Sequence, residues 1–131
     1  MPRRVFPVLC LLALGCGIQH AKAYEPGIAP VVSAMPESSH LIKAAPGNLY
    51  SLYATTGATA GYVMTFNATT APADGAVNPI ECVTAPANST ISITFDGPPD
   101  IYSVGIVVVF SSTGCFTKTA SATAFFKARA Q

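Results

Sequence analysis

Hydrophobic and polar residues alternate at a spacing of two along much of the chain after residue 48. Two segments alternate cleanly, with one apolar and one polar face each: Tyr62, Met64 and Phe66 against Thr65 and Asn67, and Ile91, Ile93 and Phe95 against Ser92, Thr94 and Asp96. Strict alternation is typical of a strand with one buried face and one wet face. Both segments are therefore predicted to be half-buried strands whose polar side chains meet solvent.

Two other segments, residues 49–53 and 106–110, are apolar on both faces. Such segments are predicted to be central strands or strands covered by a partner. Further strands are predicted at 80–84 and 122–127, and turn-forming residues separate the segments at 56–57, 72–75, 87–89 and 97–100. This spacing predicts an all-β fold, namely a small antiparallel β-sandwich, with a jelly-roll-like arrangement or an open barrel as variants.

Residues 24–47 contain prolines at 26, 30, 36 and 46, which prevent a long helix and favour extended backbone. This stretch is predicted to be a Pro-rich N-terminal arm with one short strand at 41–44. The domain organisation that follows is a signal peptide at 1–23, the extended arm at 24–47 and a β-sandwich domain at 48–131.

The first 23 residues have the three parts of a secretory signal. Arg3 and Arg4 precede an apolar run at 5–14, and Ala21-Lys22-Ala23 provides an A-x-A cleavage site before Tyr24. A membrane anchor needs about 20 apolar residues, and this run is shorter. We therefore expect cleavage between Ala23 and Tyr24, a secreted or periplasmic protein and no integral membrane span afterwards. The alternative is a lipid anchor on Cys16, because Ala13-Leu14-Gly15-Cys16 resembles a degenerate lipobox.

Cleavage would remove Cys10 and Cys16 and leave Cys82 and Cys115. A single pair of cysteines in an exported chain predicts one disulfide. The chain-entropy estimate for a loop of this length is about 3 to 4 kcal/mol. A redox or metal pair is disfavoured, because the sequence has no C-x-x-C motif and His40 is the one histidine left after cleavage.

Composition narrows the function classes. Half of the residues are hydrophobic and 10% are charged, which argues against intrinsic disorder. The net charge of the whole chain is +1, but three basic residues, Arg3, Arg4 and Lys22, lie in the removable segment. Four basic and six acidic residues remain, a net charge of −2. A nucleic-acid partner bound through phosphate neutralisation is therefore disfavoured.

The sequence offers little catalytic chemistry. Ser39 and His40 are adjacent in the chain only, and no G-x-S-x-G, H-E-x-x-H or phosphate-binding glycine loop occurs. We expect no enzyme activity, no cofactor and no resident metal. A weak calcium site at Asp96 and Asp100 is the remaining metal hypothesis, although aspartates at such positions more often begin turns. Two N-glycosylation sequons, at Asn67 and Asn88, occur near chance frequency in so Thr-rich a chain.

Several stretches resemble a family of small, uncharacterised β-rich proteins of bacterial and phage-associated genomes. The resemblance covers about residues 39–131, through the stretches 47–50, 61–62, 67–76, 86–88, 97–99, 105–109 and 115–119. It implies a virion structural or decoration-like role and carries no catalytic residues. The signal sequence departs from what a cytoplasmically assembled virion protein needs.

The function expected from these observations is a non-enzymatic structural or interaction β-domain, exported or virion-associated. Its partner is expected to be another protein or a second copy, because segments 49–53 and 106–110 each have a second apolar face. The N-terminal arm or a neighbouring subunit could cover those faces. The alternative function is a secreted small-molecule or glycan-binding module, which would need a patch of tyrosines: Tyr50, Tyr53, Tyr62 and Tyr102.

Overall fold

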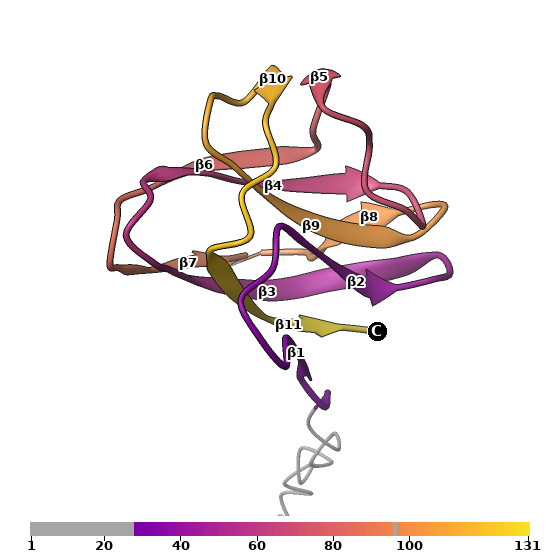
Figure 1. Cartoon of the computed structure of the whole chain (residues 1–131). Helices are drawn as coiled ribbons and strands as arrows, with labels where there is room; N and C mark the ends of the chain where they lie inside the picture. The colour runs from indigo at the N-terminus through magenta and orange to yellow at the C-terminus, as the bar shows by residue number, and fades with distance from the viewer. Residues whose placement is uncertain (1–27, 96) are drawn as a thin grey trace, which may run out of the picture.

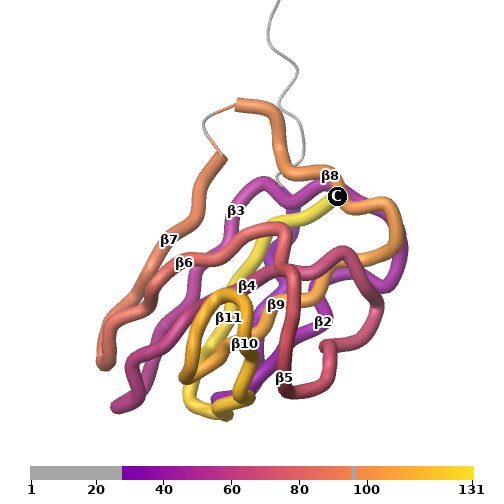
Figure 2. Tube along the Cα trace, turned by 90° about the horizontal axis from the view of Figure 1, so that it is seen from above, coloured from indigo at the N-terminus to yellow at the C-terminus, as the bar shows by residue number. Residues whose placement is uncertain are grey.

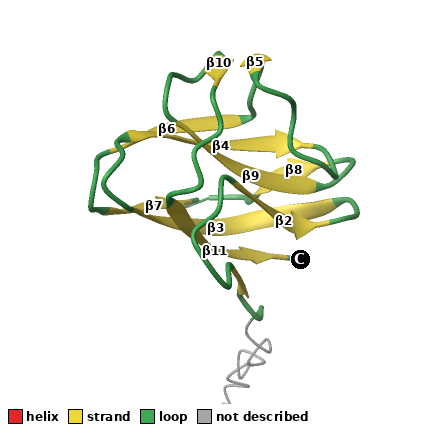
Figure 3. Cartoon of the chain, in the orientation of Figure 1, coloured by secondary structure: helices red, strands yellow, loops and turns green. Residues whose placement is uncertain are grey.

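The computed structural model describes residues 28–95 and 97–131. Regular structure in these residues is all strand, with no helix (Figure 3), and none of them forms a helix that could span a membrane. The predicted all-β sandwich is confirmed. The predicted signal peptide, including Cys16 and the Ala23–Tyr24 cleavage site, lies outside the described residues.

Two antiparallel sheets form the layers of the sandwich (Figure 1). Sheet A has the order β1-β11-β3-β7, and β8 also pairs with β3. Its strands are β1 (Val31–Val32), β3 (Gly47–Thr56), β7 (Thr90–Thr94), β8 (Asp100–Tyr102) and β11 (Ala124–Ala130). Sheet B has the order β2-β9-β4-β6. Its strands are β2 (Ser39–Lys43), β4 (Gly61–Asn67), β6 (Glu81–Ala85) and β9 (Ile106–Ser111).

The predicted N-terminal arm contributes strands to both sheets where the structure describes it. Strand β1 pairs with β11, and β2 pairs with β9. In the described residues, strand pairing therefore begins at Val31, inside the stretch 24–47, and the short strand predicted at 41–44 overlaps β2.

The main core lies between the sheets and uses alternate residues of each strand. Strand β9 is buried along its whole length, and its inward side chains are Ile106, Val108 and Phe110. Strand β3 departs from simple alternation, because its pairing with β11 passes from Ser51 to Leu49 and leaves Tyr50 as an extra residue. This β-bulge places Leu49 and Leu52 in the same core although they are three residues apart.

A second, smaller core lies on the outer face of sheet B. It consists of Met64, Phe66, Val107 and Val109, with Ala68, Val77 and Cys82 packed against it. Residues 68–80 and 112–120, here called the cap, include the two-stranded sheet formed by β5 (Gly75–Ala76) and β10 (Thr117–Lys118). Figures 1 and 2 show β5 and β10 standing over β4 and β9.

The second face of residues 106–110 is thus covered by a part of the same chain. Neither of the covers considered from sequence, the arm or a neighbouring subunit, is needed there, because the cap buries Val107 and Val109. For residues 49–53 the second face is less apolar than the sequence suggested. Tyr53 is exposed there, and Leu49 and Leu52 both point to the core.

The predicted wet face of β4 is wrong. Thr65 is fully buried, and its hydroxyl oxygen lies 2.7 Å from the hydroxyl oxygen of Tyr102. The polar side of this strand faces the main core, because Thr65 finds a buried partner there, while Met64 and Phe66 face the cap. The alternation of β7 is confirmed, since Ile91, Ile93 and Phe95 pack on the core while Ser92 and Thr94 are exposed.

The predicted disulfide joins Cys82 of β6 to Cys115 in the cap, with a Cα–Cα distance of 5.7 Å. The cap is also held by Lys118, whose buried ammonium group pairs with the carboxylate of Asp74. That carboxylate accepts a further hydrogen bond of 3.2 Å from the Ala120 amide. The disulfide therefore links the cap covalently to the sheet that it covers.

Candidate functional site

The outer face of sheet A carries exposed apolar side chains from neighbouring strands. The pairing of β1, β11 and β3 places Val32 beside Lys127 and Lys127 beside Tyr53, and Phe125 lies beside Thr55 in the next row. Val32 is 54% exposed, Phe125 42% and Tyr53 38%. We call this surface the sheet A face: Val32, Tyr53, Thr55, Thr90, Ser92, Thr94, Phe125, Lys127 and Arg129.

The charge on the sheet A face has one sign. Lys127 and Arg129 are exposed on β11, and the described strands place no carboxylate on this side of the sheet. The Arg129 guanidinium donates a hydrogen bond of 2.7 Å to the carbonyl of Ile28, which anchors the start of the described chain beside it. The face therefore combines an apolar centre with two cations, although the chain after residue 23 is net acidic.

A shallow depression of about 290 Å³ lies in this face. Its lining mixes aromatic, hydroxyl and aliphatic groups: Val32, Tyr53, Thr55, Thr90, Phe125, Phe126 and Lys127. The hydroxyl oxygens of Thr55 and Thr90 lie 2.9 Å apart and make up its polar wall. The shape suits a side chain of a partner better than an enclosed small molecule, because pockets for small ligands usually bury most of the ligand.

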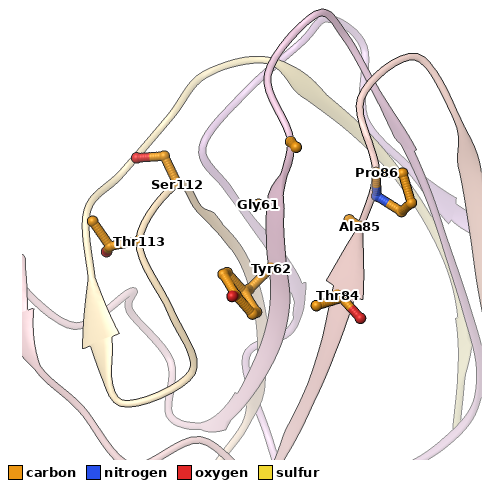
Figure 4. Close-up of a pocket in the computed structure, with 8 residues that line it drawn as sticks. Gly61, Tyr62, Thr84, Ala85, Pro86, Ser112 and Thr113 are labelled. Carbon is orange, nitrogen blue, oxygen red and sulfur yellow. The ribbon is translucent and has the colours of Figure 1, made fainter.

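A second depression, of about 410 Å³, lies over sheet B beside the cap. Figure 4 shows the ring of Tyr62 between β6 and the loop that holds Ser112 and Thr113. Thr84 of β6 lies on the other side of the ring. Gly61 forms part of the floor, where a Cβ would lie 2.2 Å from the carbonyl oxygen of Ser111, so only glycine fits this close approach. The site offers one aromatic ring and several hydroxyl groups.

The structure does not bring the four candidate tyrosines together. Tyr102 is fully buried in the main core. Tyr53 lies on the sheet A face, and Tyr62 lies on sheet B in the other depression. The Tyr50 hydroxyl donates to the side chain of Gln131 at 3.4 Å. A tyrosine patch of the kind required by the glycan hypothesis is therefore not formed.

A polar cluster spans the two sheets at one end of the core. The Thr65 hydroxyl contacts the Tyr102 hydroxyl and accepts a hydrogen bond of 3.2 Å from the Glu81 amide. The Glu81 and Asp100 carboxyl groups lie close enough to affect each other's ionisation. The Oδ2 atom of Asp100 is buried without a hydrogen-bond partner in the described residues.

The ionisation of this cluster follows from burial. Burial raises the pKa of Glu81, and the charge of Asp100 raises it further. Burial also raises the pKa of Asp100, against the effect of its hydrogen bond with Glu81. The Tyr102 pKa rises to about 12, mainly through burial. Both carboxyl groups therefore hold their protons more tightly than exposed carboxyl groups do.

The calcium hypothesis gains no support from this arrangement. Asp96 lies outside the described residues, and Asp100 faces Glu81. The described part of the chain contains no group of three or more histidine, cysteine or acidic side chains that could hold a metal ion.

The remaining sequence candidates have structural partners. The Nδ1 atom of His40 pairs with the Glu37 carboxylate at 2.7 Å. The Asn67 amide donates to the Ser103 hydroxyl at 2.9 Å and accepts from the Val104 amide at 2.8 Å, which ties β4 to the turn before β9. Asn88 lies in a turn with a φ of 50°. These contacts explain the residues as structural ones.

Comparison of the chain with protein-family models, with curated proteins and with solved structures finds no match. The resemblance to phage-associated proteins therefore remains a hypothesis, and the site must be interpreted from its own geometry.

Proposed function

We propose that this protein is a non-enzymatic structural or interaction domain, exported or virion-associated, that acts through contacts of the sheet A face. The observation that carries the proposal is a difference in burial between the outer faces of the two sheets. The cap and its disulfide bury Met64, Phe66, Val107 and Val109 outside sheet B, where Leu41 on the edge strand β2 is the exception and stays exposed. The apolar side chains outside sheet A are exposed.

The composition of the sheet A face fits a protein partner. Aromatic residues and arginine are enriched in the centres of protein interfaces, where they contribute much of the binding energy. Tyr53 and Phe125 supply the aromatic groups, and Lys127 and Arg129 lie on the strand that carries Phe125. The complementary surface is an apolar patch flanked by carboxylates on another protein.

An exported location supports this function. A disulfide persists in an oxidising environment, so the Cys82–Cys115 bridge is compatible with an extracellular or periplasmic protein. The sequence of residues 1–23 points the same way. The resemblance to phage-associated proteins supports a particle surface as one such setting.

Charged substitutions on the face test the proposal. Tyr53→Lys and Phe125→Lys should leave the protein folded, because both positions are exposed. We expect each to reduce the share of the protein that sediments with the host envelope or with phage particles. Phe116→Lys is the matched control, since Phe116 is 70% exposed but lies in the cap. Equal sedimentation of all three variants and the wild type would refute the proposal.

The second candidate function is binding of a small polar molecule, such as a saccharide, beside Tyr62. One observation favours it, namely the aromatic ring among the hydroxyls of Thr84, Ser112 and Thr113. A glycan array gives the direct test. Binding that is lost in Tyr62→Ala and kept in Tyr53→Ala would favour this function over contact through the sheet A face.

A further inference from the structure

The described part of the sandwich has five edge strands, because β7 and β8 both lie on the outer side of β3, and four of the five carry features that discourage pairing with another chain. An exposed edge presents unpaired backbone groups, which proteins usually block with charge, irregularity or short length. Strand β1 has two residues. Strand β2 carries His40 and Lys43, and its pairing shifts register. Strand β6 carries Glu81 and is crosslinked through Cys82. Strand β8 has three residues and begins at Asp100.

Strand β7, the fifth edge, carries none of these features. Its sequence is Thr-Ile-Ser-Ile-Thr, without charge or proline, and it pairs with β3 in one unbroken register. Figure 2 shows β7 at the margin of the molecule, and no described strand pairs with its outer side. This edge is therefore open to an added strand.

The backbone groups that β7 offers can be deduced from its register with β3. The Thr56 amide donates to the Ser89 carbonyl at 2.8 Å, so residues 56 and 89 form a hydrogen-bonded pair. Hydrogen-bonded pairs alternate in an antiparallel ladder, so Ile91 and Ile93 bond to β3. Thr90, Ser92 and Thr94 then direct their N–H and C=O groups outward. The close Thr55–Thr90 contact of 2.9 Å agrees, because side chains approach best in non-hydrogen-bonded pairs.

We infer that β7 pairs in antiparallel fashion with β7 of a second copy of this chain. Ser92 would lie on the two-fold axis opposite Ser92 of the second copy, and Thr90 would lie opposite Thr94. In this register, each of the three residues with outward backbone groups lies opposite another such residue on the second copy. Every outward N–H therefore meets an outward C=O. Sheet A then continues across both chains.

The strand itself favours a second copy as the occupant. A two-fold contact must be self-complementary, and an uncharged strand brings no like charges together at the axis. The register also places threonine opposite threonine and serine opposite serine on the outer side, where paired hydroxyl groups stabilise a sheet. Pro86 and Pro98, which lack an N–H group, flank the segment and confine the pairing to it.

This pairing goes beyond the proposed function, because it uses the edge of sheet A rather than its face. The two surfaces are nevertheless contiguous, since Ser92 lies beside Tyr53 in the β3–β7 register. Pairing at β7 would join the sheet A faces of two chains into one larger contact surface. A partner with repeated binding sites would then be held at two points.

Charge placed at the axis tests the pairing. The molar mass of the purified protein, measured by light scattering from micromolar to millimolar concentration, should rise from that of a monomer to that of a dimer. Ser92→Lys should raise the dimer dissociation constant roughly fivefold or more, because like charges directly opposite each other destabilise a strand pair. The Ser92→Glu variant should weaken the dimer in the same way, and an equimolar mixture of the two variants should restore it.

The controls separate this inference from other outcomes. Ser92→Thr keeps an uncharged residue and should dimerise like the wild type. Phe125→Lys changes the sheet A face away from β7 and should also dimerise, even if it fails in the sedimentation test of the proposed function. A monomer at all concentrations would overturn the inference. So would a dimer that the Ser92 charges leave unchanged, or charged variants that are not rescued by mixing.

Discussion

The outer faces of the two sheets differ in what covers them. Outside sheet B, the cap buries Met64, Phe66, Val107 and Val109 and is fixed by a disulfide and by the Lys118–Asp74 pair. Outside sheet A, Val32, Tyr53 and Phe125 are exposed between threonines and two cations. These apolar side chains of sheet B are thus covered by the chain itself, whereas those of sheet A are exposed to solvent. The difference separates residues that stabilise the fold from residues available for contact.

The largest effect should come from placing a charge under the cap. Val107→Lys puts an ammonium group into the second core, where Val107 is 2% exposed, and should cost about 3 kcal/mol or more of unfolding free energy. Tyr53→Lys, the matched change on the sheet A face, should cost less than about 0.5 kcal/mol. Urea denaturation measures both. Equal stability of the two variants would show that the outer faces do not differ.

Removal of the disulfide should have the next largest effect. A variant with both Cys82→Ala and Cys115→Ala loses the crosslink over a separation of 33 residues. We expect a loss of about 3 to 4 kcal/mol and a melting temperature lower by at least about 10 °C. Hydrogen exchange should increase first in residues 112–120 and least in β3. An unchanged melting temperature would mean that the cap needs no covalent link.

Two hydroxyl pairs allow a smaller comparison between interior and surface. Thr65→Val removes the buried partner of Tyr102 and should cost about 1 to 2 kcal/mol, because the phenol and the Glu81 amide each lose a hydrogen bond. Thr55→Val removes an exposed hydroxyl pair with Thr90 and should cost less than about 0.5 kcal/mol. Thermal unfolding of the two variants checks the order. A larger loss of stability in Thr55→Val than in Thr65→Val would contradict the assignment of Thr65 to the core and Thr55 to the exposed surface.

The smallest expected effects are on the pH dependence of stability, which should run in opposite directions for Glu81 and Asp74. Because burial raises the pKa of Glu81, the folded protein holds that proton more tightly, and the resulting stabilisation is lost as pH rises through the raised pKa. Glu81→Gln should therefore raise the melting temperature at pH 7 and bring little gain at pH 4.

Asp74 in the cap should behave in the opposite way. Hydrogen bonds from Lys118 and then from the Ala120 amide lower its pKa, so its stabilisation is present above the ordinary aspartate pKa and lost as pH falls through the lowered value. Asp74→Asn should lower the melting temperature at pH 7, with a difference that shrinks in strong acid. Parallel pH profiles of the two variants would contradict these assignments.

Much of the fold could be predicted from sequence, because alternation and turn residues are local signals. The strands at β4, β6, β7, β9 and β11 were predicted within a few residues. The buried and exposed sides of β4 were assigned wrongly, because the sequence around Thr65 does not reveal its buried hydrogen-bond partner, Tyr102, which is 37 residues away. The cap was missed for the same reason: β5 and β10 have two residues each and pair across more than forty positions.

The candidate site was harder to predict than the fold. Tyr53 was singled out, but in a tyrosine patch that the structure does not form. In the segment Ala-Phe-Phe-Lys-Ala-Arg-Ala of β11, alanines alternate with larger side chains except at Phe126, which could have indicated that Phe125, Lys127 and Arg129 share an outer face. Its neighbours on that face come from β1 and β3, and only the register of the sheet brings them together.

Hydroxyl-radical footprinting tests the central claim, that the sheet A face is the contact surface, most directly. Side-chain oxidation would be compared between the purified protein at a concentration that keeps it monomeric and the same protein in its native envelope or particle fraction. We predict that Tyr53 and Phe125 become protected in that fraction, while Phe116 and Tyr62 remain as reactive as in the isolated protein. Unchanged oxidation of Tyr53 and Phe125, with protection at Tyr62 instead, would contradict the account.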